Sequence, residues 1–348
     1  MNDRDHQKNS VPAGRARSRR TRLRSAPEPD DGAYCDVSVV VVSWNTRGLL
    51  RNCLGSILSC AGGVPFEIIV IDNASSDGSA DMVAADFPTA KIIRNVRNRG
   101  FAAANNQGLR VARGRYVLLL NPDTLILNGA IAETVRFADA HPDAAVVGCH
   151  TLCGDGRLQY NCFLFPSLVN LFLSLTRLNR LYPRNRFFGR ERMTWWDYDT
   201  PRIVDVVAGC FMLVRRRAID DVGLMDESYF MYSEETDWCW RFRRNGWKTM
   251  YTPDATIVHF REGSTSQCAA YMQILHRRSL LLFLERKSGT ATRWVANALF
   301  TVAAIVRLPA LGLAWLRGGD SRKTAAHRGR LYIAALKFHV AGSVPSSS

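Results

Sequence analysis

The feature that most constrains the fold is an apolar run that ends in a carboxylate, Leu-Leu-Leu-Asn-Pro-Asp-Thr at residues 118–124. Residues 116–120 predict a buried strand, which Pro122 ends because proline fixes φ and lacks a backbone N–H. Ligands bind at the carboxyl ends of strands in open parallel sheets. We therefore expect Asp123 at the rim of a crevice, as a ligand for a divalent cation. The alternative is a turn in which Asp123 caps the following helix.

Strand-like and helix-like segments alternate in the first third of the chain. The predicted strands are residues 37–43, 66–71, 91–94 and 116–120, and the helices between them are residues 49–58, 79–86 and 100–112. This alternation indicates right-handed βαβ units, hence an α/β fold with a mostly parallel sheet flanked by helices.

A polar residue follows each of these strands. They are Asn45, Asp72, Asn98 and Asp123, and all four are expected to face one crevice. No Gly-x-Gly-x-x-Gly or Walker-type loop follows any of the strands, which argues against a dinucleotide-binding protein and a P-loop NTPase.

The second half of the chain does not continue this regular alternation of strands and helices. A helix at 131–140 and a strand at 144–149 precede an aromatic, basic stretch at 158–200 that is either a substrate-contacting insertion or a packed connector. Residues 204–215 predict a strand broken by Gly209. A glycine inside a strand often marks the close approach of a ligand, so Gly209 is a candidate acceptor-binding residue.

An acidic and aromatic segment follows at residues 230–241, Phe-Met-Tyr-Ser-Glu-Glu-Thr-Asp-Trp-Cys-Trp-Arg. It predicts a helix that begins near Ser233. The acids are either stabilised there by the helix dipole or hold a base at the mouth of a pocket, with Trp238 against the acceptor. Residues 257–258 predict a short strand that delivers His259, either as a structural residue or as a ligand.

The net charge of +15 lies mainly in residues 1–25 and after residue 286, which suggests an anionic partner. Residues 1–34 predict a disordered basic tail, either a tether to anionic lipid or polymer or simply solvated. We expect residues 35–267 to form the globular domain, and residues 268–348 to form a basic helical segment at the membrane interface with a disordered end.

Residues 294–316 are apolar and about as long as a membrane span, but Arg307 and Pro309 interrupt them. Arginine at a bilayer centre costs roughly 2.5–3.5 kcal/mol, so a helix in the membrane interface is favoured over a span, with a helix packed on the domain as the alternative.

The nine cysteines contain no CxxC, and residues 1–25 lack an apolar core. We therefore expect a cytoplasmic protein, peripheral at the inner face of the plasma membrane.

With these segments placed, residues 37–266 resemble glycosyltransferase family 2, especially its rhamnosyltransferase-like members. The resemblance rests on six ordered elements: Val-Ser-Trp-Asn at 42–45, Val-Ile-Asp-Asn-Ala-Ser-Ser-Asp-Gly at 70–78, Asn-Arg-Gly-Phe-Ala-Ala-Ala-Asn-Asn-Gln-Gly at 98–108, Leu-Leu-Asn-Pro-Asp at 119–123, the acidic segment at 230–241, and His259 ahead of Gly263-Ser264.

The resemblance implies a GT-A fold and an inverting transfer from a nucleotide-sugar, with dTDP-rhamnose, a UDP-sugar or a GDP-sugar as donor. It implies a glycan or polyprenyl-diphosphate-linked acceptor in cell-envelope polysaccharide synthesis. The residues implied to bind the donor are Asn45, Asp72, Asn98, Arg99, Gly100, Asn105 and Asn121.

The resemblance also implies a metal and a base. Asp123 corresponds to the last acid of the Asp-x-Asp motif, with Asn121 in the first position, and would hold Mg²⁺ or Mn²⁺ together with His259. Glu234 and Glu235 match an acidic pair that is usually Glu-Asp, with Glu235 as the base.

Two other functions remain as alternatives. A nucleic-acid-binding protein would explain the basic tails, but acids gathered at one rim would repel phosphate, so we expect no nucleic acid partner. A sugar nucleotidyltransferase would usually carry a Gly-rich loop after the first strand, where this chain has Trp44-Asn45-Thr46.

Overall fold

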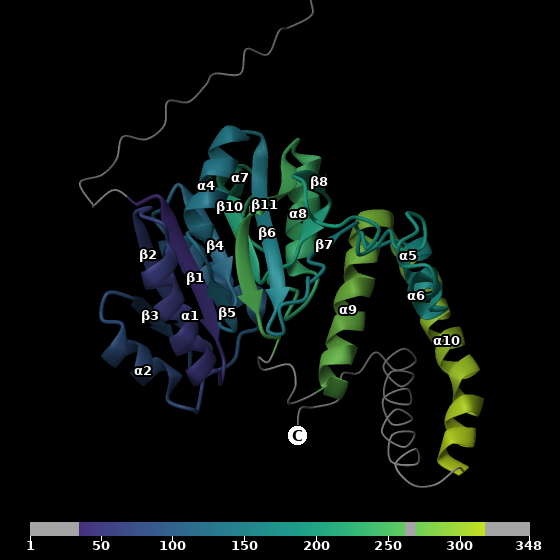
Figure 1. The fold of residues 1–348 in the computed structure, drawn as a ribbon. Coiled ribbons are helices and arrows are strands. Elements are labelled where there is room, and N and C mark those ends of the chain that lie inside the picture. The colour runs from purple at the N-terminus through teal and green to yellow at the C-terminus, as the bar shows by residue number, and fades with distance from the viewer. Residues whose placement is uncertain (1–34, 262–268, 317–348) are drawn as a thin grey trace, which may run out of the picture. The chain divides into compact units, whose positions relative to one another are not determined.

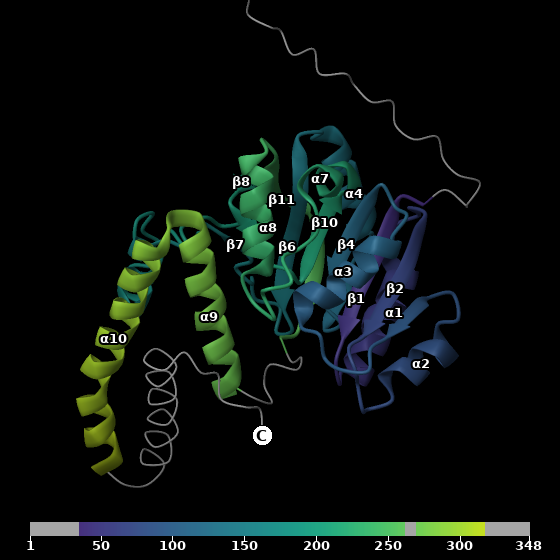
Figure 2. The ribbon, with the colours of Figure 1, turned by 180° about the vertical axis from the view of Figure 1, so that it is seen from behind.

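The computed structural model describes residues 35–261 and 269–316 (Figure 1). The predicted basic tail at 1–34, the predicted domain boundary at 267/268 and the predicted disordered end lie outside the described residues. Within the described part, a nine-stranded sheet runs in the order β3-β2-β1-β4-β10-β6-β11-β5, with β8 paired to β11. Helices cover both faces of this sheet, as the two opposite views show (Figures 1 and 2).

The first half of the sheet is parallel, as predicted. Strands β1 (Val37–Ser43), β2 (Phe66–Asp72), β3 (Lys91–Arg94) and β4 (Tyr116–Leu120) pair in parallel and alternate with helices α1 (Arg47–Cys60), α2 (Ser79–Asp86) and α3 (Phe101–Val111). Ser43 pairs with Asp72 at the carboxyl ends of β1 and β2. The polar residues after these strands therefore share one edge of the sheet.

The second half of the sheet is mixed rather than parallel. Strand β10 (Phe211–Arg215) runs antiparallel to both β4 and β6 (Ala144–Cys153), while β11 (Lys248–His259) runs parallel to β6. Strand β5 (Thr124–Ile126) pairs antiparallel with β11, so that His259 stands opposite Thr124. This pairing brings the end of β11 to the end of β4.

The strand predicted at 204–215 is instead three short strands. They are β8 (Arg202–Val204), β9 (Val206–Val207) and β10, and β9 pairs with β7 (Cys162–Phe163) in a separate two-stranded sheet. Gly209 lies in the connection between β9 and β10. Its position is therefore a loop beside the sheet edge and not a strand interior.

Alternating side chains of the central strands fill two cores, one on each face of the sheet. Val39 and Val41 of β1 face the core under α1 and α4 (Ala130–Ala140), whereas Val40 faces the core that contains α3 and α8 (Glu234–Arg244). All three valines are fully buried. Burial on both faces explains the continuous β-branched run of β1.

The C-terminal helices pack against part of the 158–200 stretch. This stretch forms β7, α5 (Leu168–Leu175), α6 (Leu178–Leu181) and turns, and α7 (Arg216–Val222) follows β10. A small apolar cluster joins Leu171 of α5 with Leu284 of α9 (Ala269–Ser288) and Phe300 of α10 (Thr290–Leu316). Among the described residues, the segment Thr290–Pro309 of α10 is the one stretch long and apolar enough to cross a membrane.

Candidate active site

A cavity of about 540 Å³ opens beside the carboxyl ends of β2 and β3. Its lining includes Asp72, Ser75, Ser76, Arg94 and Asn95. Asp72 is 5% exposed, and its Oδ2 accepts a hydrogen bond from the backbone N–H of Ser75 at 3.2 Å. Its Oδ1 has no hydrogen-bond partner among the described residues. A buried carboxylate oxygen without a partner is costly, so this atom is suited to an N–H or O–H group of a ligand.

A hydrogen-bonded loop shapes one side of this cavity, and Asn73 is its centre. The Asn73 Nδ2 donates to Asn98 Oδ1 at 2.8 Å, while its Oδ1 accepts from Asn95 Nδ2 and from the Arg99 backbone N–H, both at 3.0 Å. Asn98 also accepts from the backbone N–H of Gly100. Asn98 therefore holds the turn, and the Arg99 side chain is exposed at its tip.

Asn45 holds the other side of the cavity. It adopts a left-handed conformation with φ of 54°, and its Oδ1 accepts from the backbone N–H of Ser76 at 2.7 Å. Its own backbone N–H donates to Ser75 Oγ. Asn45 thereby fixes the two serines that line the cavity.

Gly100 joins the loop after β3 to the acidic segment. Its φ is +79°, and a Cβ atom here would lie 2.3 Å from the carbonyl oxygen of Phe230. The neighbouring Phe101 backbone N–H donates to the same oxygen at 2.7 Å. Only glycine fits this position, and its effect is to hold residue 230 against the start of α3.

Two of the predicted binding residues are buried in the core. Asn105 is 1% exposed, and its Nδ2 donates to the carbonyl of Phe101 in its own helix. Trp238 is fully buried, and its indole N–H donates to the carbonyl of Gly223 at 2.8 Å. Both side chains therefore lie in the core, and the assignments of Asn105 to the nucleotide and of Trp238 to the acceptor stay predictions that this burial does not support.

The sheet brings Asp123 and His259 together. Their closest atoms, Asp123 Oδ1 and His259 Nε2, lie 3.2 Å apart, and both side chains are buried. The Asn121 Nδ2 lies 3.4 Å from the same imidazole nitrogen. On the other side of the ring, His259 Nδ1 lies 3.2 Å from Gln159 Oε1. A partner at Nδ1 orients the ring, so that Nε2 points at Asp123.

Asp123 and His259 lie close enough for the charge of one side chain to affect the pKa of the other. Burial alone would lower the pKa of His259. The neighbouring Cys210 and Asp123 raise it by more, so the pKa of His259 is about 10. The carbonyl of Cys210 accepts the Asn121 backbone N–H at 3.0 Å, which places Gly209 next to this group. Carboxylate, imidazole and amide oxygen are all divalent-metal ligands. Among the described residues, no three His, Cys, Asp or Glu side chains group as a complete metal site.

Glu234 and Glu235 occupy the first turn of α8. They follow Tyr232 and Ser233, two successive residues with left-handed φ angles of 70° and 64°. Such conformations cost about 1–3 kcal/mol each and persist where the surrounding structure enforces them, often at active sites. The helix therefore starts abruptly, with both carboxylates at its positive end.

The two carboxylates differ in environment. Glu234 is 4% exposed, and its Oε2 has no hydrogen-bond partner among the described residues. Burial and then the charge of Glu235 raise the pKa of Glu234 well above its ordinary value. Burial also raises the pKa of Glu235, while backbone N–H groups of the first turn lower it in part. Glu235 retains partial exposure, so it is the member of the pair that an external hydroxyl can reach.

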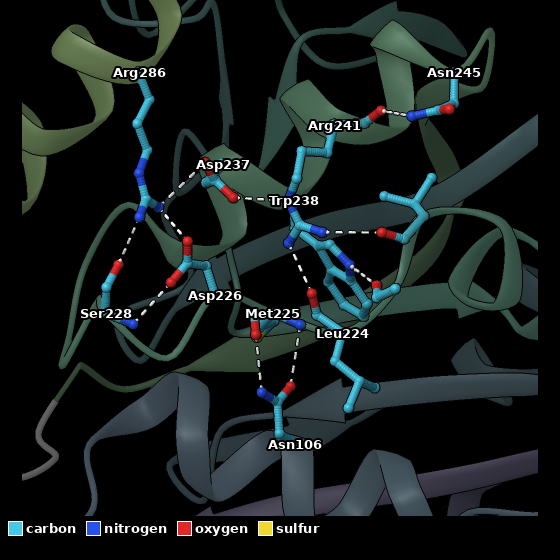
Figure 3. A network of polar contacts seen from close by, with 12 residues as sticks. Asn106, Leu224, Met225, Asp226, Ser228, Asp237, Trp238, Arg241, Asn245 and Arg286 are labelled. Carbon is cyan, nitrogen blue, oxygen red and sulfur yellow. Dashed lines mark hydrogen bonds and ion pairs between the residues drawn. The ribbon is translucent and has the colours of Figure 1, made fainter.

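A polar network fixes α8 in place (Figure 3). Arg241 binds Asp237 at 2.8 Å and donates to the carbonyl of Leu224, also at 2.8 Å. Arg286 of α9 pairs with Asp226 and lies 4.0 Å from Asp237. The third acid of the segment, Asp237, therefore anchors the helix, and the network ties the acidic pair to α9.

Sequence reasoning missed three residues of this site. Asn73 stands next to a predicted residue, Gln159 lies in the stretch without periodicity, and Cys210 lies in an apolar segment. The only available signal was for Asn73, whose polar neighbours suggested loop chemistry. Nothing in the sequence connects Gln159 or Cys210 with His259, because their contact depends on the strand order.

The comparisons with known proteins decide the family. The profile described as "Glycosyl transferase family 2" matches residues 38–223, more than half of the chain. The chain belongs to glycosyl transferase family 2. The predicted resemblance is confirmed, and the protein is a glycosyltransferase rather than a nucleic-acid-binding protein or a nucleotidyltransferase.

Rhamnosyltransferases are among the relatives of this family 2 protein. An N-acetylglucosaminyl-diphospho-decaprenol L-rhamnosyltransferase of Mycobacterium tuberculosis is 29% identical over 266 residues, covering 72% of this chain and 85% of the relative. The rhamnosyltransferase WbbL of Escherichia coli is 24% identical over 269 residues, covering 74% and 96%.

A solved structure supports the fold. The mannosyltransferase PcManGT from Pyrobaculum calidifontis, in complex with GDP-Man and Mn²⁺, has a TM-score of 0.50 and 18% identity. The likeness covers 91% of this chain and 92% of that one. The predicted GT-A-like fold is thereby confirmed.

Proposed function

We propose that this family 2 protein catalyses an inverting transfer of a hexose, with L-rhamnose as the favoured sugar, from a nucleotide-sugar to a polyprenyl-diphosphate-linked acceptor. The observation that carries the proposal is the convergence of Asp123 and His259, at 3.2 Å, on the sheet edge that also bears Asp72. The names of the rhamnosyltransferase relatives support the sugar and the acceptor class. The product would enter cell-envelope polysaccharide.

The nucleoside of the donor would occupy the cavity at Asp72. The Oδ1 of this residue, which has no partner within the described ranges, would accept a ring N–H or a ribose hydroxyl. Thymine, uracil and guanine nucleotides all carry such a donor. Arg99, exposed at the tip of the loop, provides a positive charge near the same edge. dTDP-rhamnose is the donor that agrees with the relatives, and UDP- and GDP-sugars are the other candidates.

The residues around Asp123 fit a divalent cation. Mg²⁺ is typically held by one or two carboxylates together with substrate phosphates, so a small protein ligand set is sufficient. Asp123 and His259 would hold Mg²⁺ or Mn²⁺, with Asn121 beside them and Gln159 orienting the imidazole. When bound, the cation would stabilise the negative charge that develops on the diphosphate leaving group.

Glu235 would act as the base. The acceptor hydroxyl gives its proton to the Glu235 carboxylate as its oxygen bonds to the anomeric carbon. The bond from that carbon to the diphosphate oxygen breaks on the opposite side, and the nucleoside diphosphate leaves with the electron pair. A single displacement of this kind inverts the anomeric configuration. Gly209, in the half-exposed loop before Cys210, would leave room for the acceptor.

The lipid-linked acceptor would bring the enzyme to a membrane. Helix α10 presents large apolar side chains to solvent, among them Trp294 at 68%, Val302 at 57% and Val306 at 70% exposure. An apolar helix face with flanking arginines is typical of interfacial membrane helices. We propose peripheral association with the inner face of the plasma membrane through this helix.

The first experiment is a thermal-shift panel of nucleotide-sugars with and without Mn²⁺. A ligand that binds only the folded state adds about 2.7 kcal/mol of stability at a hundred times its Kd. We expect a metal-dependent shift with one donor class, dTDP-rhamnose first. A shift of equal size without metal would contradict the metal site.

A transfer assay then tests the reaction. We expect the purified chain, with the identified donor and N-acetylglucosaminyl-diphospho-polyprenol in detergent, to form a product whose new bond has the opposite anomeric configuration to the donor. Retained configuration would rule out the single displacement. Absence of product with every sugar, despite donor binding, would rule out this acceptor.

A further inference from the structure

A second cavity lies away from the proposed reaction centre, at the C-terminal end of α8. Its volume is about 450 Å³, and its lining comes from the β7–α5, α6–β8 and β8–β9 connections and from α8 and α9. The charged residues in its wall are Arg190, Asp205, Arg243, Arg244 and Lys287. Arg244 follows Glu235 by nine residues, which is about 13 Å along an α-helix.

The charges in this cavity do not balance. Asp205 is the only acid in the lining, and it pairs with Arg243. Among the described residues, no carboxylate forms an ion pair with Arg190, Arg244 or Lys287. Three cations therefore converge on the cavity without a compensating anion.

The cations are held in place by rings and carbonyls. Lys287 Nζ donates to the carbonyl of Pro166 at 3.0 Å and lies 5.5 Å from the centre of the Phe165 ring. Arg244 lies 5.0 Å from the centre of the Trp240 ring. These contacts position the charges without neutralising them. Burial lowers the pKa of Lys287, and Arg243 lowers it further although Asp205 raises it.

Contact with the helix dipole accounts for only part of this cluster. Arginines in the last turn of α8 interact favourably with its negative end. Arg190 and Lys287 come from other elements, so the composition of the last turn of α8 does not explain their place beside Arg244. The cavity brings them to the same place as Arg244, which is the arrangement expected for an anionic ligand.

The surroundings of the cavity identify the source of the anion. Helix α5 begins one residue after the cavity residue Ser167, and it exposes Val169 at 44% and Phe172 at 48%. Helix α10, with its exposed apolar face, packs directly on α5 and α9. A basic cavity at the border of an apolar surface matches a phospholipid, whose phosphate lies at the edge of the hydrocarbon.

We propose that this cavity binds the phosphate group of an anionic membrane phospholipid. The proposal rests on the proposed membrane association but not on the proposed reaction, because the cavity contains no residue assigned to donor, metal or base. Lipid binding here would fix how the enzyme lies on the bilayer while the reaction centre remains open to its substrates.

The test compares two double variants of the full chain in vesicle flotation. R190Q/R244Q removes two cavity cations, whereas R136Q/R217Q removes two arginines of α4 and α7 that do not line the cavity. Each Lys or Arg near an anionic bilayer contributes about 1 kcal/mol, or about fivefold in binding. We expect R190Q/R244Q to lose more than tenfold in binding to phosphatidylglycerol vesicles, and the control less than threefold.

Three further measurements make the result decisive. Binding to phosphatidylcholine vesicles, which lack net charge, should be the same for both variants, and donor-induced thermal shifts should be unchanged in both. Equal losses in the two variants on anionic vesicles would overturn the proposal. If R190Q/R244Q lost only a thermal shift caused by soluble pyrophosphate and kept its vesicle binding, the cavity would be a site for a soluble phosphate and the lipid assignment would be overturned. R244Q alone serves as the variant if the double substitution unfolds.

Discussion

The chemistry of this site depends on small differences between adjacent residues. Glu234 and Glu235 share one helical turn, yet only Glu235 is partly exposed, while Glu234 is buried with an unpartnered oxygen among the described residues. Burial raises the pKa of both carboxylates, and removal from water also strengthens electrostatic interactions with a substrate. The two side chains are therefore expected to respond differently to substitution.

Glu235→Gln should abolish transfer and leave donor binding nearly intact, because the base acts on the acceptor. We expect the turnover rate to fall by about 10²–10⁴-fold, the usual contribution of a general base. Turnover is measured with saturating donor, and donor affinity by thermal shift. Equal loss of both properties would assign Glu235 to binding.

The rate should also depend on pH in a defined direction. The base must be ionised, and its pKa lies above the ordinary value of 4.5, so activity should be retained at higher pH and lost as the pH falls through the raised value. A pH–rate profile at saturating substrates measures this. An acid limb at or below pH 4.5 would contradict the burial of Glu235.

Gln159→Ala tests the orientation of His259. A partner at the second imidazole nitrogen typically contributes 10–100-fold to metal affinity. We expect Mn²⁺ to be required at 10–100-fold higher concentration for the donor-dependent thermal shift, with the affinity for free nucleoside less affected. The same Mn²⁺ requirement as in the unmodified chain would show that Gln159 does not orient the ring.

At the scale of elements, the parts of the site are joined by close backbone packing. The loop after β3 and the start of α8 belong to distant parts of the sequence, yet Gly100 packs on Phe230 and the Phe101 N–H binds its carbonyl. The donor cavity and the acidic pair are therefore coupled through one glycine. Disturbing that contact should affect both halves of the site.

Gly100→Ala, with Gly63→Ala as the matched control, isolates this contact. Both glycines have φ near +80°, and an alanine held at such a positive φ costs about 1–3 kcal/mol. Only at Gly100 would the new Cβ also meet a backbone oxygen, which adds about 1–3 kcal/mol. Chemical denaturation should show the larger loss of stability for Gly100→Ala, together with reduced transfer, and equal losses would show that the contact is not tight.

The sequence predicted the elements better than their arrangement. The β-branched run of β1, the acid that ends β2 and the acid that follows β4 could be predicted from the sequence, because burial and strand ends both produce local residue patterns. The strand order that sets β10 antiparallel between β4 and β6 leaves none, so the mixed half of the sheet was not predicted. The same limit hid Gln159. The burial of Trp238 was not predictable either, because the sequence pattern of an aromatic residue in a core does not differ from that of one in a pocket.

At the scale of the whole molecule, the described chain combines a polar sheet edge, where the proposed reaction takes place, with an apolar helical surface. Arg286 links the two, because it binds Asp226 and approaches Asp237 beside the acidic pair while standing on α9. Helix α9 packs in turn on α10 and α5. A membrane contact at α10 is thus connected by continuous packing to the helix that carries Glu235.

Under the proposed membrane association, the position of Arg307 favours an α10 that lies in the interface over one that crosses the bilayer. The Arg307 guanidinium donates to the carbonyl of Leu175 at the end of α5, which holds the side chain against a partner outside α10 without neutralising its charge. A crossing helix would have to carry both that arginine and its polar partner into hydrocarbon, at a cost of several kcal/mol.

The exposed residues Val302 and Val306 of α10 are four residues apart and therefore lie on the same face of the helix.

Val302→Asp/Val306→Asp should therefore weaken vesicle binding by tenfold or more without destabilising the fold, since both side chains are exposed and burying one in the bilayer is worth about 1.5 kcal/mol. Val111→Asp, at an exposed valine of α3, is the matched control and should bind as the unmodified chain does. Alkaline carbonate should release the unmodified chain from membranes, because an interfacial helix is held by surface contacts alone. A chain that carbonate fails to release, and that tolerates both aspartates, would be held by something other than this helix face.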